Sequence, residues 1–68
     1  MTVKPLQPYQ QRVVLERDAL GERTQKLESM IHSEAFVKIN PDEQIRMHRQ
    51  LSLQHQLIAT LNERIAAF

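Results

Sequence analysis

Apolar residues recur along the first half of the chain at alternating steps of three and four positions, which is the spacing of one face of an α-helix. We call this face the first seam, and its apolar members are Val13, Leu20, Leu27 and Ile31. Two polar residues, Arg17 and Thr24, interrupt it. The pattern predicts a first helix from about Pro8 to His32, because proline fits the first turn of a helix.

The second half of the chain has a more regular seam, and all but one of its members are apolar. The seam consists of Met47, Leu51, Gln54, Ile58, Leu61, Ile65 and Phe68. It predicts a second helix from about Pro41 to Ala67. We expect Asn40 to cap the start of this helix and Glu43 to complete a variant of the capping box.

The segment between the two helices is the predicted break. We expect Ser33 to cap one short helical turn that runs through Phe36. The apolar side chains of Phe36, Val37 and Ile39 are expected to fold under the hairpin as a plug. A connection of about eight residues between two long helices makes them antiparallel neighbours.

The predicted fold class is therefore all-α, an antiparallel two-helix hairpin with a short intervening helical turn. Pro5 and Pro8 disfavour helix before them, so residues 1–7 are expected to form an irregular N-terminal arm. Residues 8–68 are expected to form a single helical hairpin domain.

A second set of apolar residues lies off both seams. Its members are Val14, Leu15, Ile45, Leu53, Leu57, Ala59 and Ala66. Together with the seams they make an apolar surface too wide for a solvated two-helix hairpin. The sequence therefore predicts a homo-oligomer.

The composition of the chain limits which binding partners and which cellular compartment we expect for it. The chain has 68 residues and no cysteine, and no apolar run approaches the roughly 20 residues of a membrane span. The N-terminus lacks the apolar core of a signal peptide, so we expect a soluble cytoplasmic protein with no membrane partner. Nine Lys and Arg against eight Asp and Glu, with mixed signs, argue against polymeric nucleic acid as a partner.

Metal binding and catalysis are not expected. His48 and His55 lie two helical turns apart, roughly 10.5 Å along the axis, which is too far for one ion. These residues and His32 are interpreted as solvated or interface histidines. No serine lies at a strand-to-helix elbow, so we expect neither an enzyme nor a cofactor. The acidic residues of the first helix are expected to form surface ion pairs with Arg12, Arg23 and Lys26.

Tyr9 is the first candidate for ligand binding. It lies at the entry of the first helix, where free N–H groups attract anions. Its ring offers a face on which a nucleobase can stack. The alternative is that Tyr9 packs the N-terminal arm onto a neighbour.

A second candidate region lies in the middle of the first helix and consists of Arg17, Arg23, Thr24 and Lys26, with Gly21 one turn before Thr24. Glycine inside a helix costs about 1 kcal/mol against alanine and often marks close approach of another backbone or a ligand. Brought near Tyr9 of another copy, these cations would form a pocket for a phosphate-linked base. The alternative is a solvated charged face with Gly21 as a packing notch.

The order of residues resembles a known family. The chain reads PYQQRVVLERDALGERTQKLESMI, then a short turn SEAFVKI, then a polar helix that ends in LNERIAAF. From Tyr9 to Phe68 this is similar to the hairpin domain of small phage anti-CBASS proteins. CBASS is a bacterial defence that signals with cyclic oligonucleotides, and these phage proteins are sponges that sequester the signal without cleaving it.

The resemblance implies a compact homohexamer in the host cytoplasm, with cyclic dinucleotides bound between subunits and, in some members, cyclic trinucleotides at a separate site. By position, Tyr9 matches the stacking aromatic residue and Gln10 its polar neighbour. Arg23, or Lys26 in another register, matches the basic residue that holds phosphate. The remaining matches are Thr24 or Gln25 for the polar partner beside it and Arg64 for a late arginine at the trinucleotide site.

Two positions depart from the family pattern. The family often has lysine where Arg23 stands, but arginine binds phosphate in a bidentate manner, so the change is compatible with binding. The family often has a branched apolar residue where Thr24 stands, and a polar residue there weakens the seam.

Two other functions remain open from the sequence alone. One is a helical-hairpin module that binds and blocks a host protein. The other is a small helical RNA-binding protein that uses Lys38, Arg46 and Arg49, against which the near-neutral net charge counts.

Overall fold

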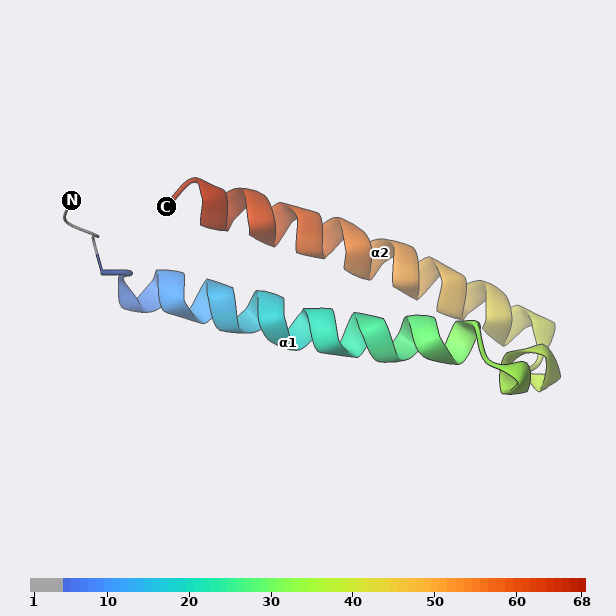
Figure 1. The fold of residues 1–68 in the computed structure, drawn as a ribbon. Coiled ribbons are helices and arrows are strands. Elements are labelled where there is room, and N and C mark those ends of the chain that lie inside the picture. Colours follow the sequence, from blue (N-terminus) through green and yellow to red (C-terminus); the bar gives the residue numbers. More distant parts are fainter. Residues whose placement is uncertain (1–4) are drawn as a thin grey trace.

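The computed structural model describes residues 5–68, which form an elongated hairpin with extents of 54 × 18 × 16 Å (Figure 1). The elements are α1 (Pro8–Ile31), the 3-10 helix η1 (Glu34–Lys38) and α2 (Pro41–Ala66). The helices α1 and α2 pack side by side and antiparallel, and residues 5–68 contain no strand. This confirms the predicted all-α hairpin with its intervening helical turn.

Both long helices begin where the prolines predict. Each ends one residue earlier than expected, at Ile31 and Ala66. Residues 1–4 of the predicted arm lie outside the described part of the chain, and residues 5–7 are not helical. The start of α1 and the end of α2 therefore meet at the same end of the hairpin (Figure 1).

The start of α2 is capped by one residue rather than by a reciprocal pair. The side-chain oxygen of Asn40 accepts a 2.8 Å hydrogen bond from the backbone N–H of Asp42, as the sequence predicts. The predicted return bond from Glu43 was wrong. Its carboxylate instead accepts a 3.1 Å hydrogen bond from Arg46, one turn along the helix, where a charge-assisted bond is available.

The turn end of the hairpin is closed by Phe36, which is buried and meets the ring of His48 edge to face at 5.4 Å. The amide of Gln44 donates to the backbone carbonyls of Phe36 and Ile39, at 3.0 and 2.8 Å. The predicted plug is therefore correct for Phe36. It was wrong for Val37, which is 76% exposed because adjacent residues of a helix point in different directions.

Ser33 precedes η1, as expected, but its hydroxyl does not cap it. The hydroxyl donates a 2.6 Å hydrogen bond back to the carbonyl of Met30. Ser33 therefore ends α1 rather than starting the next turn.

The core of the hairpin comes from the two seams. Val13, Leu20 and Leu61 form a buried cluster, against which Ile58 and Ile65 pack. The buried positions are a minority of the apolar residues. Large side chains that stay exposed on both long helices include Leu15, Ile45, Leu53 and Leu57.

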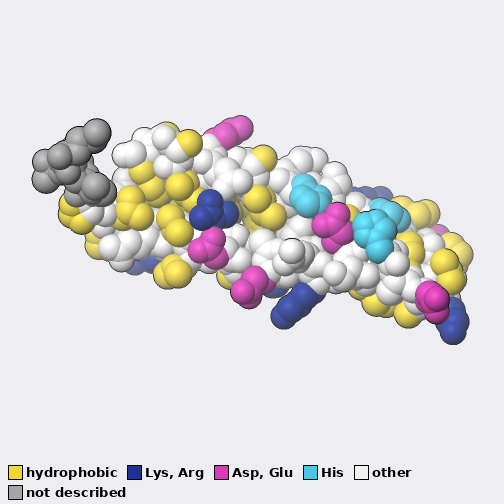
Figure 2. All heavy atoms as spheres, viewed as in Figure 1, with side chains coloured by type: hydrophobic (Ala, Val, Ile, Leu, Met, Phe, Trp, Pro, Cys, Tyr) yellow, Lys and Arg dark blue, Asp and Glu magenta, His cyan; other side chains and the backbone are white. Residues whose placement is uncertain are grey.

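Hydrophobic side chains accordingly reach the surface along the hairpin, interspersed with charged and histidine side chains (Figure 2). The apolar residues off the seams are therefore exposed within a single chain, except Val14, which is half-buried. Neither long helix of residues 5–68 combines the length and hydrophobicity needed to cross a membrane.

Candidate functional site

Tyr9 lies against Phe68 where the hairpin opens. The two rings meet edge to face, with 6.2 Å between their centroids and 73° between their planes. Tyr9 still keeps 53% of its surface exposed. The contact with Phe68 therefore orients the tyrosine while leaving half of it available to a ligand or to another copy.

Gln10 belongs to the start of α1. Its side-chain oxygen accepts a 2.8 Å hydrogen bond from the backbone N–H of Gln7, and its amide donates a long 3.4 Å bond to the Tyr9 hydroxyl. Gln10 thus gives the backbone N–H of Gln7, just before α1, a hydrogen-bond partner, and it also contacts Tyr9. A ligand role for Gln10 stays a prediction.

Arg64 lies at the same end of the hairpin as Tyr9. It is exposed in the last turn of α2, four residues before Phe68, which follows the end of that helix. Arg64 forms no ion pair within residues 5–68. The antiparallel arrangement therefore places Arg64 at the end of the hairpin where Tyr9 meets Phe68.

Arg23 and Lys26 lie elsewhere, in the middle of α1. Arg23 is fourteen residues beyond Tyr9, which is about 21 Å along the helix axis at 1.5 Å per residue. Both cations are exposed. Within one chain they are too far from Tyr9 to share a small ligand with it.

The predicted ion pairs of Arg12, Arg23 and Lys26 were wrong. Across residues 5–68 the ion pairs join Arg17 to Asp18 and Arg46 to Glu43. An exposed pair is worth at most about 1 kcal/mol and competes with the entropy of two long side chains, so correct spacing alone does not ensure it. Three cations of α1 are left exposed and unpaired in this part of the chain.

Thr24 and Gln25 differ in accessibility. Thr24 is only 3% exposed, because it points into the seam against α2, and Gln25 is exposed. The Thr24 hydroxyl and the side-chain oxygen of Gln54 are buried without a hydrogen-bond partner among the described residues. In the closed hairpin Thr24 is out of reach of a ligand, and its predicted role there requires the helices to part.

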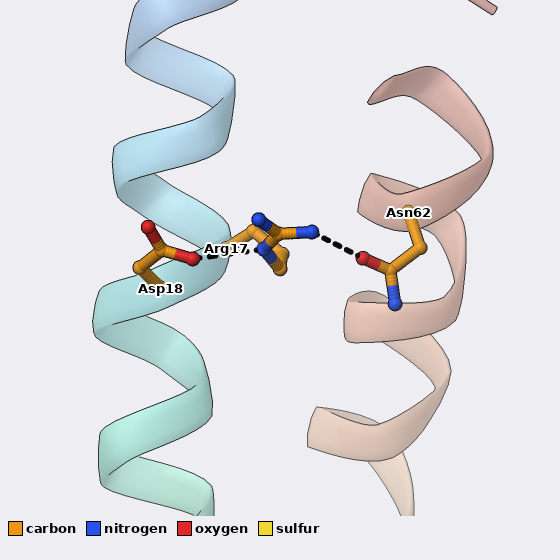
Figure 3. Close-up of polar contacts among 3 residues, drawn as sticks. All are labelled: Arg17, Asp18 and Asn62. Atoms are coloured by element: carbon orange, nitrogen blue, oxygen red, sulfur yellow. Dashed lines mark hydrogen bonds and ion pairs between the residues drawn. The ribbon is translucent and has the colours of Figure 1, made fainter. Parts of the chain in front are cut away.

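Arg17, the other polar residue in the first seam, links the two helices. Its guanidinium donates to the carboxylate of Asp18 and, at 2.9 Å, to the side-chain oxygen of Asn62 on α2 (Figure 3). Gly21, one turn later, has open space where a Cβ would lie. The hairpin therefore does not use Gly21 as a packing notch.

Residues 5–68 contain no group of three or more His, Asp and Glu residues placed to hold a metal ion. The same residues enclose no pocket. A ligand held by this hairpin would lie on its surface or between two copies.

Sequence reasoning missed two residues at the open end. Phe68 was recognised only as the last member of its seam, yet the antiparallel register carries that seam to the start of α1, where it meets Tyr9. Arg12 was assigned to an ion pair. Its position one turn after Tyr9 was the signal that it shares the side of α1 on which the tyrosine lies.

Comparison with known proteins identifies a family. A family model described as Sequestin matches residues 7–67, which is nearly the whole described chain. No significant match was found among curated proteins or among solved structures.

Proposed function

The chain belongs to the Sequestin family, a name compatible with sequestering a molecule, and from this premise we propose that it is a sponge for cyclic oligonucleotide messengers. It binds cyclic dinucleotides, and also cyclic trinucleotides, without cleaving them. In the host cytoplasm it thereby keeps the messenger from the effectors of CBASS. The similarity of the chain from Tyr9 to Phe68 to phage anti-CBASS hairpins supports this choice of ligand.

The observation that carries the proposal is the half-exposed ring of Tyr9, which packs against Phe68. Arg64 lies at the same end of the hairpin and forms no ion pair within residues 5–68. An aromatic ring offers a stacking surface for a base, and such stacking contributes about 1–3 kcal/mol per base. A guanidinium offers two parallel hydrogen bonds to a phosphate. Arg64 at the same end supplies this group.

A closed binding site on this hairpin needs a second copy. Tyr9 and Arg23 lie about 21 Å apart along α1, so one small ligand contacts both only if they come from different chains. Exposed Leu53 and Leu57 on α2 provide apolar surface for that association. We propose a homo-oligomer, with the hexamer of the similar phage proteins as its expected form, whose interfaces enclose the ligand.

Sequestration places few demands on the chemistry of the site. It requires no nucleophile and no proton transfer, only an affinity high enough to compete with the effector for scarce messenger. The stacking ring and the unpaired cations supply binding interactions alone. We therefore propose that the chain acts as a binding protein and not as an enzyme.

A ligand panel tests the proposal. The purified protein is heated with cyclic dinucleotides, cyclic trinucleotides, mononucleotides and ADP, and its melting temperature is recorded. A ligand bound only to the native state raises the melting temperature. We expect a rise with cyclic oligonucleotides and recovery of intact ligand after denaturation. No shift with any cyclic di- or trinucleotide, or a cleaved product, contradicts the proposal.

A second function has its own supporting observation at the opposite end of the hairpin. Val37 and Ile45 are 76% and 59% exposed near the turn, far from Tyr9. These side chains offer apolar surface to a host protein that the hairpin would block. Retained anti-defence activity after combined replacement of Tyr9 and Arg23 by alanine would favour this function over the sponge.

A further inference from the structure

The polar residues that interrupt the two seams lie opposite one another. The bond from Arg17 to Asn62 shows which level of α1 lies beside which level of α2. Thr24 is seven residues after Arg17, and Gln54 is eight residues before Asn62. Because the helices run antiparallel, Thr24 and Gln54 lie at the same level of the hairpin to within about one residue, or about 1.5 Å (Figure 1).

Thr24 and Gln54 therefore form a polar layer between the two helices. Thr24 is 3% exposed, and the side-chain oxygen of Gln54 is buried. Neither oxygen has a hydrogen-bond partner among residues 5–68. Burial of a polar group without a partner costs free energy, so the polar layer does not stabilise the hairpin.

The apolar residues of the seams do not by themselves determine how far α2 is shifted along α1. Both seams repeat every seven residues, so a shift by seven residues places apolar residues opposite apolar residues again. Leu20 lies at the level of Ile58, and after such a shift it would lie at the level of Leu51 or Ile65. Burial of apolar surface alone therefore discriminates poorly between these registers.

The connection between the helices also leaves room for such a shift. Moving one helix by seven residues displaces it by about 10.5 Å. Residues 32–40 join α1 to α2, and nine residues span up to about 30 Å when they are extended. Once η1 unfolds, the connection can therefore accommodate the shifted register.

The polar layer does discriminate between the registers. In the observed register a hydroxyl donor, Thr24, and an amide acceptor, Gln54, occupy the same level and can pair with each other. After a shift by seven residues Thr24 would lie at the level of Leu61 or Met47 instead. Buried polar residues in a helical seam fix the register of coiled coils in this way, at a cost in stability.

We propose that Thr24 and Gln54 are positioning residues, which select the register of α1 against α2 and thereby bring Tyr9 to Phe68. The two rings are in contact in the observed register, and a shift by seven residues would move them about 10.5 Å apart along the helices. Thr24 then acts through the register and without touching a ligand. The proposal goes beyond the sponge function and does not depend on it.

Replacement of both polar residues by apolar residues of similar shape tests the proposal. Thr24→Val combined with Gln54→Leu should raise the melting temperature and also produce a second set of NMR resonances, about 10% of the signal or more. The reporter is the nuclear Overhauser effect between the rings of Tyr9 and Phe68, which the second set should lack. A double variant with one set of resonances and this contact intact would overturn the proposal.

Thr60→Val combined with Gln56→Leu is the matched control, because it makes the same two replacements at exposed positions of α2. The control should give one set of resonances that includes the contact between Tyr9 and Phe68, as should the unmodified protein. A second set of equal intensity in the control would assign the heterogeneity to added apolar surface and would overturn the proposal.

Discussion

The guanidinium of Arg17 donates a 2.9 Å hydrogen bond to the side-chain oxygen of Asn62, and this bond joins the two helices across their seam (Figure 3). Arg17 stands at a position where the seam pattern calls for an apolar side chain. By reaching across, it keeps its charged group partly in solvent and ties one level of α1 to one level of α2.

Breaking this bond should lower stability modestly. We expect Arg17→Ala and Asn62→Ala each to reduce the free energy of unfolding by about 1 kcal/mol, the usual net value of such a bond. A double-mutant cycle in urea measures the coupling between them. A coupling energy indistinguishable from zero would show that the bond does not hold the register.

Replacement of Thr24 by valine should raise the free energy of unfolding instead of lowering it. Its buried hydroxyl has no hydrogen-bond partner among residues 5–68, so Thr24→Val should stabilise the fold by about 1 kcal/mol. Thr60→Val is the control, because the hydroxyl of Thr60 is exposed and donates to the carbonyl of Gln56. Thermal unfolding checks both variants.

Thr24→Val also tests the predicted ligand role of Thr24. Since the residue is 3% exposed, we expect nucleotide affinity to change less than twofold while stability rises. A large loss of affinity in a stably folded Thr24→Val protein would show that the seam opens to admit the ligand. Binding of the best ligand of the panel, measured by calorimetry, gives the answer.

The spacing of apolar residues predicted the fold well, because two helices that pack together must bury the same face of each helix along its whole length. Val13, Leu20 and Leu61 are buried as their spacing requires, and the proline and asparagine signals placed the start of α2 correctly. Val37 was misplaced because a short 3-10 turn gives no apolar period to read.

The candidate site was less predictable because exposed polar contacts are weak and depend on register. Arg12 was assigned an ion pair that does not form, since the energy of an exposed pair is close to zero. The meeting of Tyr9 with Phe68 depends on how far the two helices slide past each other. The separation of Tyr9 from Arg23 along α1 follows from helix geometry alone, as does that of His48 from His55 along α2.

The ring of Tyr9 should matter more than its hydroxyl. We expect Tyr9→Ala to weaken cyclic dinucleotide binding about tenfold or more, because it removes the stacking surface. Tyr9→Phe keeps the ring and should stay within about threefold of the original affinity. Fluorescence or calorimetric titration distinguishes them, and equal losses in the two variants would assign the role to the hydroxyl.

Self-association should depend on the exposed apolar residues of α2. Leu57 is 44% exposed, and we expect Leu57→Glu to shift the protein to a smaller species in sedimentation velocity. Gln56→Glu introduces the same charge one residue earlier, where the exposed side chain is already polar, and should leave the mass unchanged. A folded monomer of the unmodified protein at micromolar concentration would contradict the proposed oligomer.

The most direct test of the sponge is calorimetric titration of the unmodified protein with the cyclic oligonucleotide that stabilises it most, followed by chromatography of the ligand released on denaturation. The account predicts a dissociation constant in the micromolar range or tighter, with the ligand recovered chemically intact. Absence of binding heat together with absence of thermal stabilisation across cyclic di- and trinucleotides, or recovery of a linearised product, would contradict it.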